Sequence, residues 1–350
     1  MRVWPLAYLG SVLVGLFAAW VYRAQQPTTI EATIVSIDAS GPVARNQKSL
    51  SKAENPRPFF RPAVPPSEPG RWSPLPSLNA PLAALYPILK ARADQGDAPA
   101  ACRLSAELHW CTRVQEAIDF EVSANRIKVQ KRLDPDGHCS GVSASHRRQA
   151  IGYARQAALA GSLSAIEAYV GGDLMSADIE AAADYVAEYA DEAPRLAEAG
   201  LQAGSRRILD RYMMATADSG GLDWFSRAVG SNLRPSRRAM IWLLAMRVSP
   251  ETAPELMVPG DPNPAIRKVG FIFDLPIDSV QALNVVVADW QQMWFSEAGR
   301  AHSGQAEGTR SFAARPENEP RPDFNRDCSE RYIEAPLSRP AIVWPEVRTL

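Results

Sequence analysis

The sequence carries almost no net charge and lacks the short motifs of common catalytic sites. Its 350 residues include 38 Lys and Arg and 39 Asp and Glu, a formal net charge of −1. Such a balance gives no general attraction to nucleic acid or to anionic lipid. There is no phosphate-binding loop, dinucleotide fingerprint, metalloprotease helix or nucleophile elbow, and Ser140 and Ser143 near His138 lack an accompanying acid. The sequence therefore predicts a non-enzymatic protein with no cofactor and no nucleic-acid partner.

Cysteine is scarce, with four residues: Cys102, Cys111, Cys139 and Cys328. An even number in an exported chain favours two disulfides. Cys102 and Cys111 are expected on one helix, roughly 13.5 Å apart along its axis and half a turn out of phase. A disulfide requires Cα atoms within about 7 Å, so these two are not expected to pair with each other.

Two disulfide pairings remain open: Cys102–Cys328 with Cys111–Cys139, or Cys102–Cys139 with Cys111–Cys328. The first is favoured because Cys139 lies in the loop after the helix that carries Cys111. A further alternative is four buried thiols that pack as small hydrophobic groups.

A tetrahedral metal site is a weaker hypothesis for the same part of the chain. It would use His109, Cys111, His138 and Cys139 as nitrogen and sulfur ligands. Their spacing lacks the usual two to four residues between paired ligands, and adjacent side chains such as His138 and Cys139 rarely bind one ion. We therefore predict no metal site.

The N-terminus contains one long apolar run, residues 3–22, between Arg2 and Arg23. About 20 apolar residues are needed to cross a hydrocarbon core of about 30 Å. Aromatic residues lie near both ends of the run, as expected at a membrane interface: Trp4, Tyr8, Trp20 and Tyr22. We expect residues 1–25 to be an uncleaved signal anchor of the bacterial inner membrane, with the bulk of the chain in the periplasm.

Two other interpretations of the apolar run remain open. A cleaved signal peptide is the main alternative, and it would leave a secreted or periplasmic chain. The sequence Tyr22-Arg23-Ala24 is a poor cleavage site, and no cysteine follows to form a lipoprotein signal. A buried helix of a soluble protein is the third interpretation.

The rest of the chain divides by its proline content and its helical patterns. Residues 26–78 are rich in proline and predict a semi-rigid linker. A helical repeat domain is expected over residues 79–248, with Asn79 as the first helix cap. Residues 249–300 combine a proline-rich break with a closing amphipathic helix that begins near Asp278. Residues 301–350 are expected to form an irregular tail, held through Cys328 if it is held at all.

The expected helices are joined by short connections, which are typical of antiparallel neighbours. The fold class is therefore all-α, an irregular α-solenoid-like array of antiparallel helix pairs behind a membrane helix and a linker. The expected ranges are 98–133, 144–160, 162–172, 177–190, 193–203, 205–218, 222–230 and 235–247.

An Ala/Gly-punctuated pattern recurs in residues 91–104, 154–170 and 193–212. Each copy has small residues at helical spacing, a Gly-centred break, and a second helix that opens with small or polar residues. Residues 150–169 resemble the Sel-like repeat, a relative of the tetratricopeptide repeat, through Ala150, Tyr153, Ala157, Ala158, Gly161 and Ala165. The resemblance implies an α/α scaffold for protein–protein contacts in the bacterial envelope, and it implies no catalytic residue.

The array also carries a polarised charge pattern. Residues 178–198 are acidic, and the following part of the chain is basic. A partner-binding surface would use Tyr185, Tyr189, Arg206, Arg207, Arg211 and Tyr212, because aromatic residues and arginine dominate binding hot spots. The alternative is salt bridging between successive helices, with the aromatic rings in the core.

The predicted function is an adaptor or assembly role, through binding to a protein partner in the cell envelope. An envelope enzyme or binding protein that acts on cell-wall glycan is one alternative. The carboxylates considered for it are Glu167, Asp173, Asp178 and Glu180, which also fit a solvated helix face. A secreted effector with a cleaved signal peptide is the other alternative.

Overall fold

The computed structural model describes residues 72–120, 126–216, 223–230, 233–248, 264–295, 321–329 and 332–346. All of them belong to one unit, Pro58–Leu350. The expected signal anchor and most of the expected linker lie outside the described residues.

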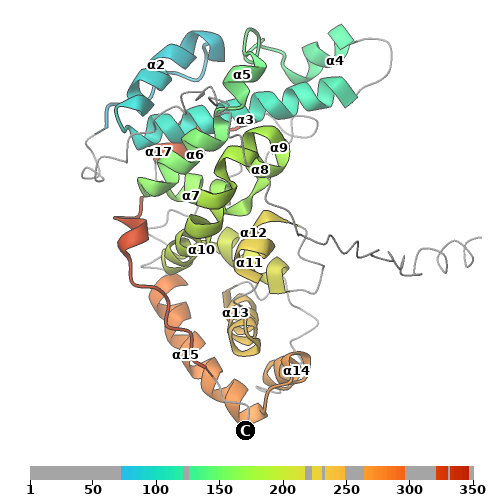
Figure 1. Ribbon diagram of the computed structural model, residues 1–350, viewed down its shortest axis with the longest axis vertical. Coiled ribbons are helices and arrows are strands. Elements are labelled where there is room, and N and C mark those ends of the chain that lie inside the picture. The colour runs from blue at the N-terminus through green and yellow to red at the C-terminus, as the bar shows by residue number, and fades with distance from the viewer. Residues whose placement is uncertain are drawn as a thin grey trace, which may run out of the picture. The chain divides into compact units, whose positions relative to one another are not determined.

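The described residues are helical, and no strand occurs among them (Figure 1). The predicted all-α class is confirmed. The helices are α2 Leu82–Asp94, α3 Ala98–Phe120, α4 Arg126–Leu133, α5 Ala144–Arg147, α6 Ala150–Leu159, α7 Leu163–Gly171, α8 Asp173–Ala177, α9 Ile179–Ala182, η1 Ala183–Tyr185, α10 Val186–Gln202, α11 Arg206–Thr216, α12 Trp224–Val229, α13 Pro235–Val248, α14 Pro264–Phe273, α15 Ile277–Phe295, α17 Phe324–Ser329 and η5 Pro336–Ser338.

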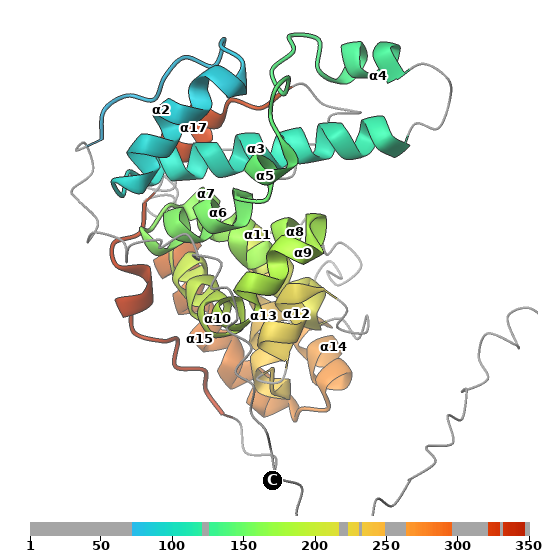
Figure 2. The ribbon, with the colours of Figure 1, turned by 45° about the horizontal axis from the view of Figure 1, so that its top comes forward.

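Most helices pack against helices that are near to them in the sequence. Helix α3 contacts α2 and α6, α7 contacts α6 and α10, and α13 contacts α11, α14 and α15 (Figures 1 and 2). Helix α17 is the main exception, because it packs on α3 from far along the chain. Enclosed between α2, α6 and α17, α3 is buried on every side from Ala98 to Cys111.

Three helix junctions share one turn geometry, at Gly96, Gly161 and Gly204. Their φ angles are +88°, +91° and +77°, a region that favours glycine. At each turn the glycine N–H donates to the carbonyl three residues back, and the next N–H donates to the carbonyl five residues back. This is the Schellman arrangement that ends many helices. The predicted Gly-centred breaks are confirmed at these three positions.

The residue after each of these glycines caps the next helix. Asp97 accepts a hydrogen bond from the amide of Ala100, Ser162 from Ala165, and Ser205 from Ile208. A glycine and a capping side chain therefore end one helix and start the next within two residues.

Gly161 also lets the C-terminal segment approach α6 and α7 closely. The Ile333 amide donates to the Gly161 carbonyl at 2.7 Å. A Cβ atom at Gly161 would lie 2.0 Å from the Ile333 carbonyl oxygen, so the position excludes any side chain. Gly204 has the same relation to the end of α15, where a Cβ atom would lie 2.3 Å from the Trp294 carbonyl oxygen.

We expect Gly161→Ala to lower the free energy of unfolding by about 2–3 kcal/mol, because it combines backbone strain with a clash against Ile333. Gly137→Ala is the matched control. Its φ is +65°, but the nearest atom to a new Cβ is Ser140 Oγ at 3.4 Å. The control is expected to cost only about 1 kcal/mol. Urea unfolding measures both, and equal losses would contradict the proposed clash.

Both disulfides follow the favoured pairing. Cys102 is bonded to Cys328, with Cα atoms 5.6 Å apart, and Cys111 to Cys139, with Cα atoms 5.3 Å apart. The second disulfide occupies the two sulfurs that the weaker metal hypothesis required. Within the described residues, no group of three or more His, Cys, Asp and Glu side chains is placed to hold a metal ion.

Several expected boundaries were wrong. Asn79 is not a cap, because α2 begins at Leu82 after Pro81, with no side-chain cap. Residues 98–133 do not form one helix, since α4 is separate and packs back against α3. The expected break near residue 191 is absent, because α10 continues through Pro194 between buried residues. Helix α14 begins at Pro264, the last residue of the expected proline-rich break over residues 249–264, and no helix was expected between this break and Asp278.

The expected closing helix is present as α15, which packs on α13 and α14. Its buried side is formed by Val280, Leu283, Val287, Trp294 and Phe295.

Within the described ranges, no single helix has the length and hydropathy to cross a membrane. Only α14 and α15 together meet that criterion, and they are bent by 114° at their junction.

The chain on either side of the helices is folded onto them over longer stretches than expected. Arg92 donates to the carbonyls of Ser73 and Pro74, so residues 72–78 belong to the folded unit. At the other end, the tail places four hydrophobic side chains in the core: Phe324, Cys328, Ile333 and Ile342.

Candidate functional site

One face of α10 binds the backbone of a segment near the C-terminus, which consists of the short 3-10 helix η5 and extended chain on either side of it. We call this segment, residues 332–346, the strap. Arg195, Glu198 and Gln202 are spaced three and four positions apart, so they lie on one face of α10. Arg195 donates to the Leu337 carbonyl, and Gln202 Nε2 donates to the Pro340 carbonyl at 3.1 Å. These contacts hold the peptide backbone of the strap and do not depend on its side chains.

Glu198 connects the strap to the helices through both of its carboxylate oxygens. Oε2 accepts the Ile342 amide at 3.0 Å, and Oε1 accepts the Trp344 indole Nε1 at 3.1 Å. Arg237 of α13 also donates to Oε1, at 3.0 Å. The side chains of Glu198 and Arg237 are only 15% and 13% exposed, so the ion pair is shielded from solvent and less screened than a surface pair.

The Trp344 indole lies in a site built from four helices. The Arg237 guanidinium stands 4.2 Å from the centre of the indole ring, a cation–π contact. Trp290 of α15 meets the indole edge to face at 5.2 Å, and the Tyr212 ring of α11 lies 6.4 Å away. With Glu198 of α10, these residues provide a charged acceptor, a cation and two aromatic walls for one indole.

The strap itself is only shallowly embedded. Ile333, Pro336 and Ile342 are buried, whereas Trp344 is half-buried. Six strap residues that follow Pro336 are exposed: Ser338, Arg339, Pro340, Ala341, Val343 and Glu346. In Figure 1 the strap, in red, runs down beside α10 and α15, first with the turn of η5 and then as an extended chain. The arrangement resembles a bound peptide more than a core element.

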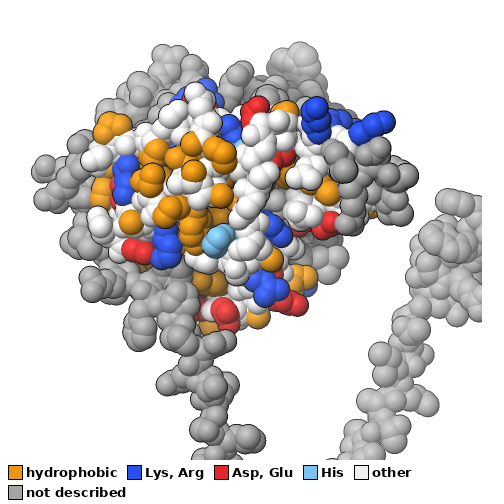
Figure 3. Space-filling view, turned by 90° about the horizontal axis from the view of Figure 1, so that it is seen from above, with side chains coloured by type: hydrophobic (Ala, Val, Ile, Leu, Met, Phe, Trp, Pro, Cys, Tyr) orange, Lys and Arg blue, Asp and Glu red, His pale blue; other side chains and the backbone are white. Residues whose placement is uncertain are grey.

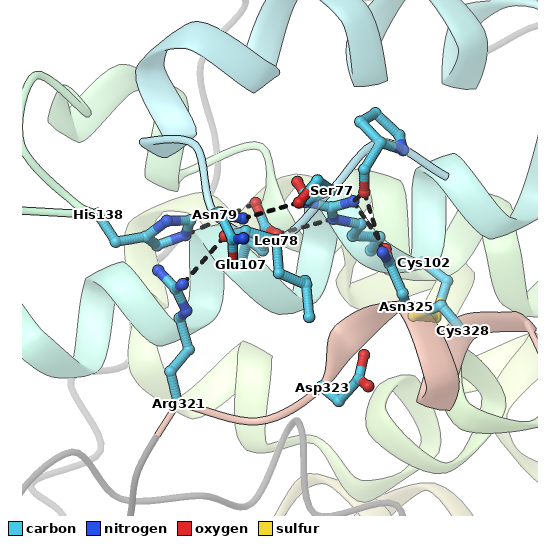
Figure 4. A network of polar contacts seen from close by, with 12 residues as sticks. Ser77, Leu78, Asn79, Cys102, Glu107, His138, Arg321, Asp323, Asn325 and Cys328 are labelled. Carbon is cyan, nitrogen blue, oxygen red and sulfur yellow. Dashed lines mark hydrogen bonds and ion pairs between the residues drawn. A yellow bond between two sulfur atoms is a disulfide. The ribbon is translucent and has the colours of Figure 1, made fainter. Parts of the chain in front are cut away.

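A second polar cluster lies inside the unit, around Arg103 (Figure 4). We call Arg103, Glu107 and Asn325, with the carbonyls of Pro76 and Ser77, the clasp. The Arg103 guanidinium is fully buried and donates to Glu107 at 2.8 Å, to Asn325 Oδ1 at 2.7 Å and to both carbonyls. Asn325 donates back to the Pro76 carbonyl at 2.9 Å. The clasp therefore joins residues 76–77, α3 and α17, beside the Cys102–Cys328 disulfide.

The other carboxylate oxygen of Glu107 faces a buried histidine. Oε2 lies 3.7 Å from His138 Nε2, and both side chains are almost inaccessible. Burial lowers the pKa of His138 to about 4, and Arg321 acts in the same direction. Burial raises the pKa of Glu107, against the opposing charge of Arg103. Both groups lie in the interior, where they bring α3 and the loop after α4 together.

The depressed pKa of His138 predicts a loss of stability in acid. The folded state keeps the imidazole neutral, whereas the unfolded chain takes up a proton near the ordinary value of 6.5. The stability that depends on neutral His138 is therefore complete above pH 6.5 and falls as the pH decreases toward about 4. We expect the stability difference between the wild type and His138→Gln to shrink over this window.

Urea unfolding at a series of pH values measures this difference. His146→Gln on α5, where the ring is half-buried against Tyr86, is the matched control and should preserve the wild-type slope. A constant difference between the wild type and His138→Gln from pH 6.5 to pH 4 would contradict the assignment.

The structure does not form one surface from the predicted partner-binding residues. Tyr189 and Tyr212 are core side chains, 1% and 0% exposed, so their expected role as surface anchors was wrong. Tyr189 donates to the Val170 carbonyl, and Tyr212 packs against Phe225. Among the other expected members, Tyr185 is half-buried, Arg206 is exposed, and Arg207 and Arg211 both pair with Asp173.

The acidic and basic stretches meet within the chain, as the alternative interpretation expected. Arg237 of the basic part binds Glu198 of the acidic part, whereas Glu192 is bound by Arg155, which precedes both. The carboxylates considered for glycan chemistry have protein partners too. Glu167 is buried and accepts the Ser205 hydroxyl at 2.6 Å. Asp173 pairs with arginines of α11, and Asp178 and Glu180 both pair with Arg148.

One further surface feature is visible from above (Figure 3). Hydrophobic side chains gather over α2, and Lys and Arg side chains lie over α4. Ala84, Pro87, Ile88 and Ala91 form one exposed face of α2, and Ile88 is 51% exposed. Ile88 is the one large side chain of this face, and no polar residue lies among the four.

The strap site was not predicted from the sequence. Glu198 was seen only as one charge of an acidic stretch, and residues 332–346 were expected to be irregular. The sequence signal that could have found the site is the spacing of Arg195, Glu198 and Gln202 on one helical face. Comparison with known proteins adds no assignment: no family model matches the chain, and neither a curated protein nor a solved structure matches it.

Proposed function

We propose that the chain is a non-catalytic scaffold that binds a protein partner through its helical array. The observation that carries this proposal is the side-chain recognition of an extended backbone by α10, with Glu198, Arg195 and Gln202 as the contacting groups. Binding of a peptide backbone by polar side chains, with one aromatic anchor in a defined site, is a mode of protein recognition.

We propose a membrane-anchored location in the bacterial periplasm. Two observations support it: the apolar run at residues 3–22 and the two disulfides, which persist in oxidising compartments. The Sel-like resemblance is part of the same proposal. It is supported by the three matched turns at Gly96, Gly161 and Gly204, each followed by a capping side chain.

Photocrosslinking in the native host tests the proposed function. A photoreactive amino acid is placed singly at exposed positions: Arg339 and Val343 on the strap, Arg206 on α11, and Ile88 on α2 as a distant control. We expect one protein of the envelope to be joined at the first three positions and to be absent at Ile88. The identified protein, purified separately, should then bind the purified chain saturably.

Two results would overturn the proposal. One is crosslinking at all four positions to the same abundant proteins. The other is the absence of saturable binding by any protein identified in this way.

A further inference from the structure

We propose that the site occupied by the strap is a binding site for an extended segment of another protein, and that the strap is its intramolecular competitor. This inference deepens the proposed scaffold function and rests on it. The external segment has the chemistry that the site already selects: a branched aliphatic residue two positions before a tryptophan, in an extended and proline-containing backbone.

The contacts define this chemistry. Ile342 is the buried aliphatic anchor, and its amide is bound by Glu198. Trp344, two positions later, places its indole N–H on the same carboxylate and its ring under Arg237. Val343, between the two anchors, is 86% exposed and contributes nothing to selection. The pattern is therefore aliphatic, any residue, tryptophan.

A charge at the end of the strap extends the pattern. Glu346 forms an ion pair with Arg234, and both side chains are about two-thirds exposed, at 66% and 68%. Exposed pairs of this kind contribute little affinity but favour a partner of the matching sign. An acidic residue two positions after the tryptophan is therefore preferred and is not required.

The site is largely preformed without the strap. Glu198 and Arg237 hold each other at 3.0 Å, and Arg237 also donates to the Tyr212 hydroxyl at 3.3 Å. Trp290 is stacked on Trp294 with ring centres 4.6 Å apart, so the aromatic wall is fixed from within the array. A site organised by its own contacts does not need to be reshaped for a new occupant.

The contacts of the strap also allow it to dissociate from the helices. From Pro336 to Glu346 only Pro336 and Ile342 are buried, and the backbone contacts come from Arg195, Glu198 and Gln202, none of which is a core residue. A tethered competitor has an effective concentration in the millimolar range, so an external segment binds weakly until the strap is weakened. The strap thus sets a threshold for partner binding.

A labelled peptide that spans residues 334–348 is the probe. We expect it to bind the full-length Trp344→Ala chain in detergent about tenfold or more tightly than it binds the wild type, because the tethered competitor is weakened. Val343→Ala, a neighbouring strap change at an exposed side chain, is the matched control and should behave as the wild type. A peptide with alanine at both anchor positions should not bind any of the three chains.

Two further measurements test the strap site without relying on the Trp344→Ala variant alone. Arg195→Ala with Gln202→Ala, added to Trp344→Ala, should abolish peptide binding while the circular dichroism stays unchanged. In the unmodified chain, excess peptide should accelerate hydrogen exchange of the strap's own amide at Ile342, which Glu198 binds. No peptide binding to a folded Trp344→Ala chain, or no change in strap exchange, would overturn the inference.

A second copy of the chain is the other occupant that the test distinguishes. A concentration-dependent dimer that the peptide dissociates would show that straps exchange between copies, and it would overturn binding of another protein. The two proposals fail separately. A crosslinked partner that does not compete with the peptide would leave the scaffold function standing and remove only the strap site.

Discussion

Replacement of Arg103 by methionine is expected to lower the free energy of unfolding by about 3–5 kcal/mol, because it leaves a buried carboxylate without its cation. Arg103 and Glu107 are both 0% exposed and are one turn apart on α3. The guanidinium also supplies hydrogen bonds to Asn325 and to the carbonyls of Pro76 and Ser77, and each would lose a buried donor. Urea unfolding at pH 7 measures the loss.

The chain contains a matched control for this change. Lys90 and Asp94 form a pair of the same spacing on α2, but their side chains are 41% and 51% exposed. Lys90→Met is expected to change stability by only about 0.5 kcal/mol or less, because exposed pairs are weak. The double variant Arg103→Met with Glu107→Met should regain part of the loss, since no charge remains buried. Equal losses for Arg103→Met and Lys90→Met would contradict the structural role of the clasp.

Removal of the Cys102–Cys328 disulfide is expected to destabilise the chain more than removal of the Cys111–Cys139 disulfide. The two bonds link positions 226 and 28 residues apart. Chain-entropy scaling gives about 5.5 kcal/mol for the longer loop and about 3.5 kcal/mol for the shorter one. Paired Cys→Ser variants, unfolded in urea under oxidising conditions, measure the difference of about 2 kcal/mol.

The same variants also show whether each disulfide stabilises only by shortening the unfolded chain or also holds nearby segments in place. Cys102→Ser with Cys328→Ser should also increase hydrogen exchange in α17 and the strap, because α17 carries the lost crosslink and the strap follows it. The shorter disulfide should affect only the loop around Cys139. Equal unfolding free energies for the two variants would contradict the loop-length argument.

Features set by one helix could be predicted from the sequence. The separation of Cys102 and Cys111 on a single helix excluded their pairing, and the favoured alternative is the one observed. The turns at Gly161 and Gly204 were predictable for the same reason, since the backbone conformation and the cap depend on adjacent residues. Pro264 was misinterpreted as a break, although proline is well suited to the first position of a helix, where it begins α14.

Features set by distant packing could not be predicted in this way. An oppositely charged pair such as Arg103 and Glu107, one turn apart, usually marks an exposed face. Only the packing of α2, α6 and α17 around α3 buries it. The strap is similar, because Ile342 and Trp344 meet Glu198 from 144 and 146 positions away. The prolines and polar residues of the strap are typical of a loop, and no pattern within residues 332–346 indicates which side chains contact the helices.

The nested order of the two disulfides has a consequence for how the chain matures. Cys102 is synthesised first, yet its partner follows 226 residues later, after both Cys111 and Cys139. An oxidant that joined thiols in their order of appearance would trap Cys102 with Cys111, a pairing that a formed α3 helix forbids. Correct maturation therefore requires either α3 to fold before oxidation begins or a disulfide isomerase to release Cys102 from an early wrong bond.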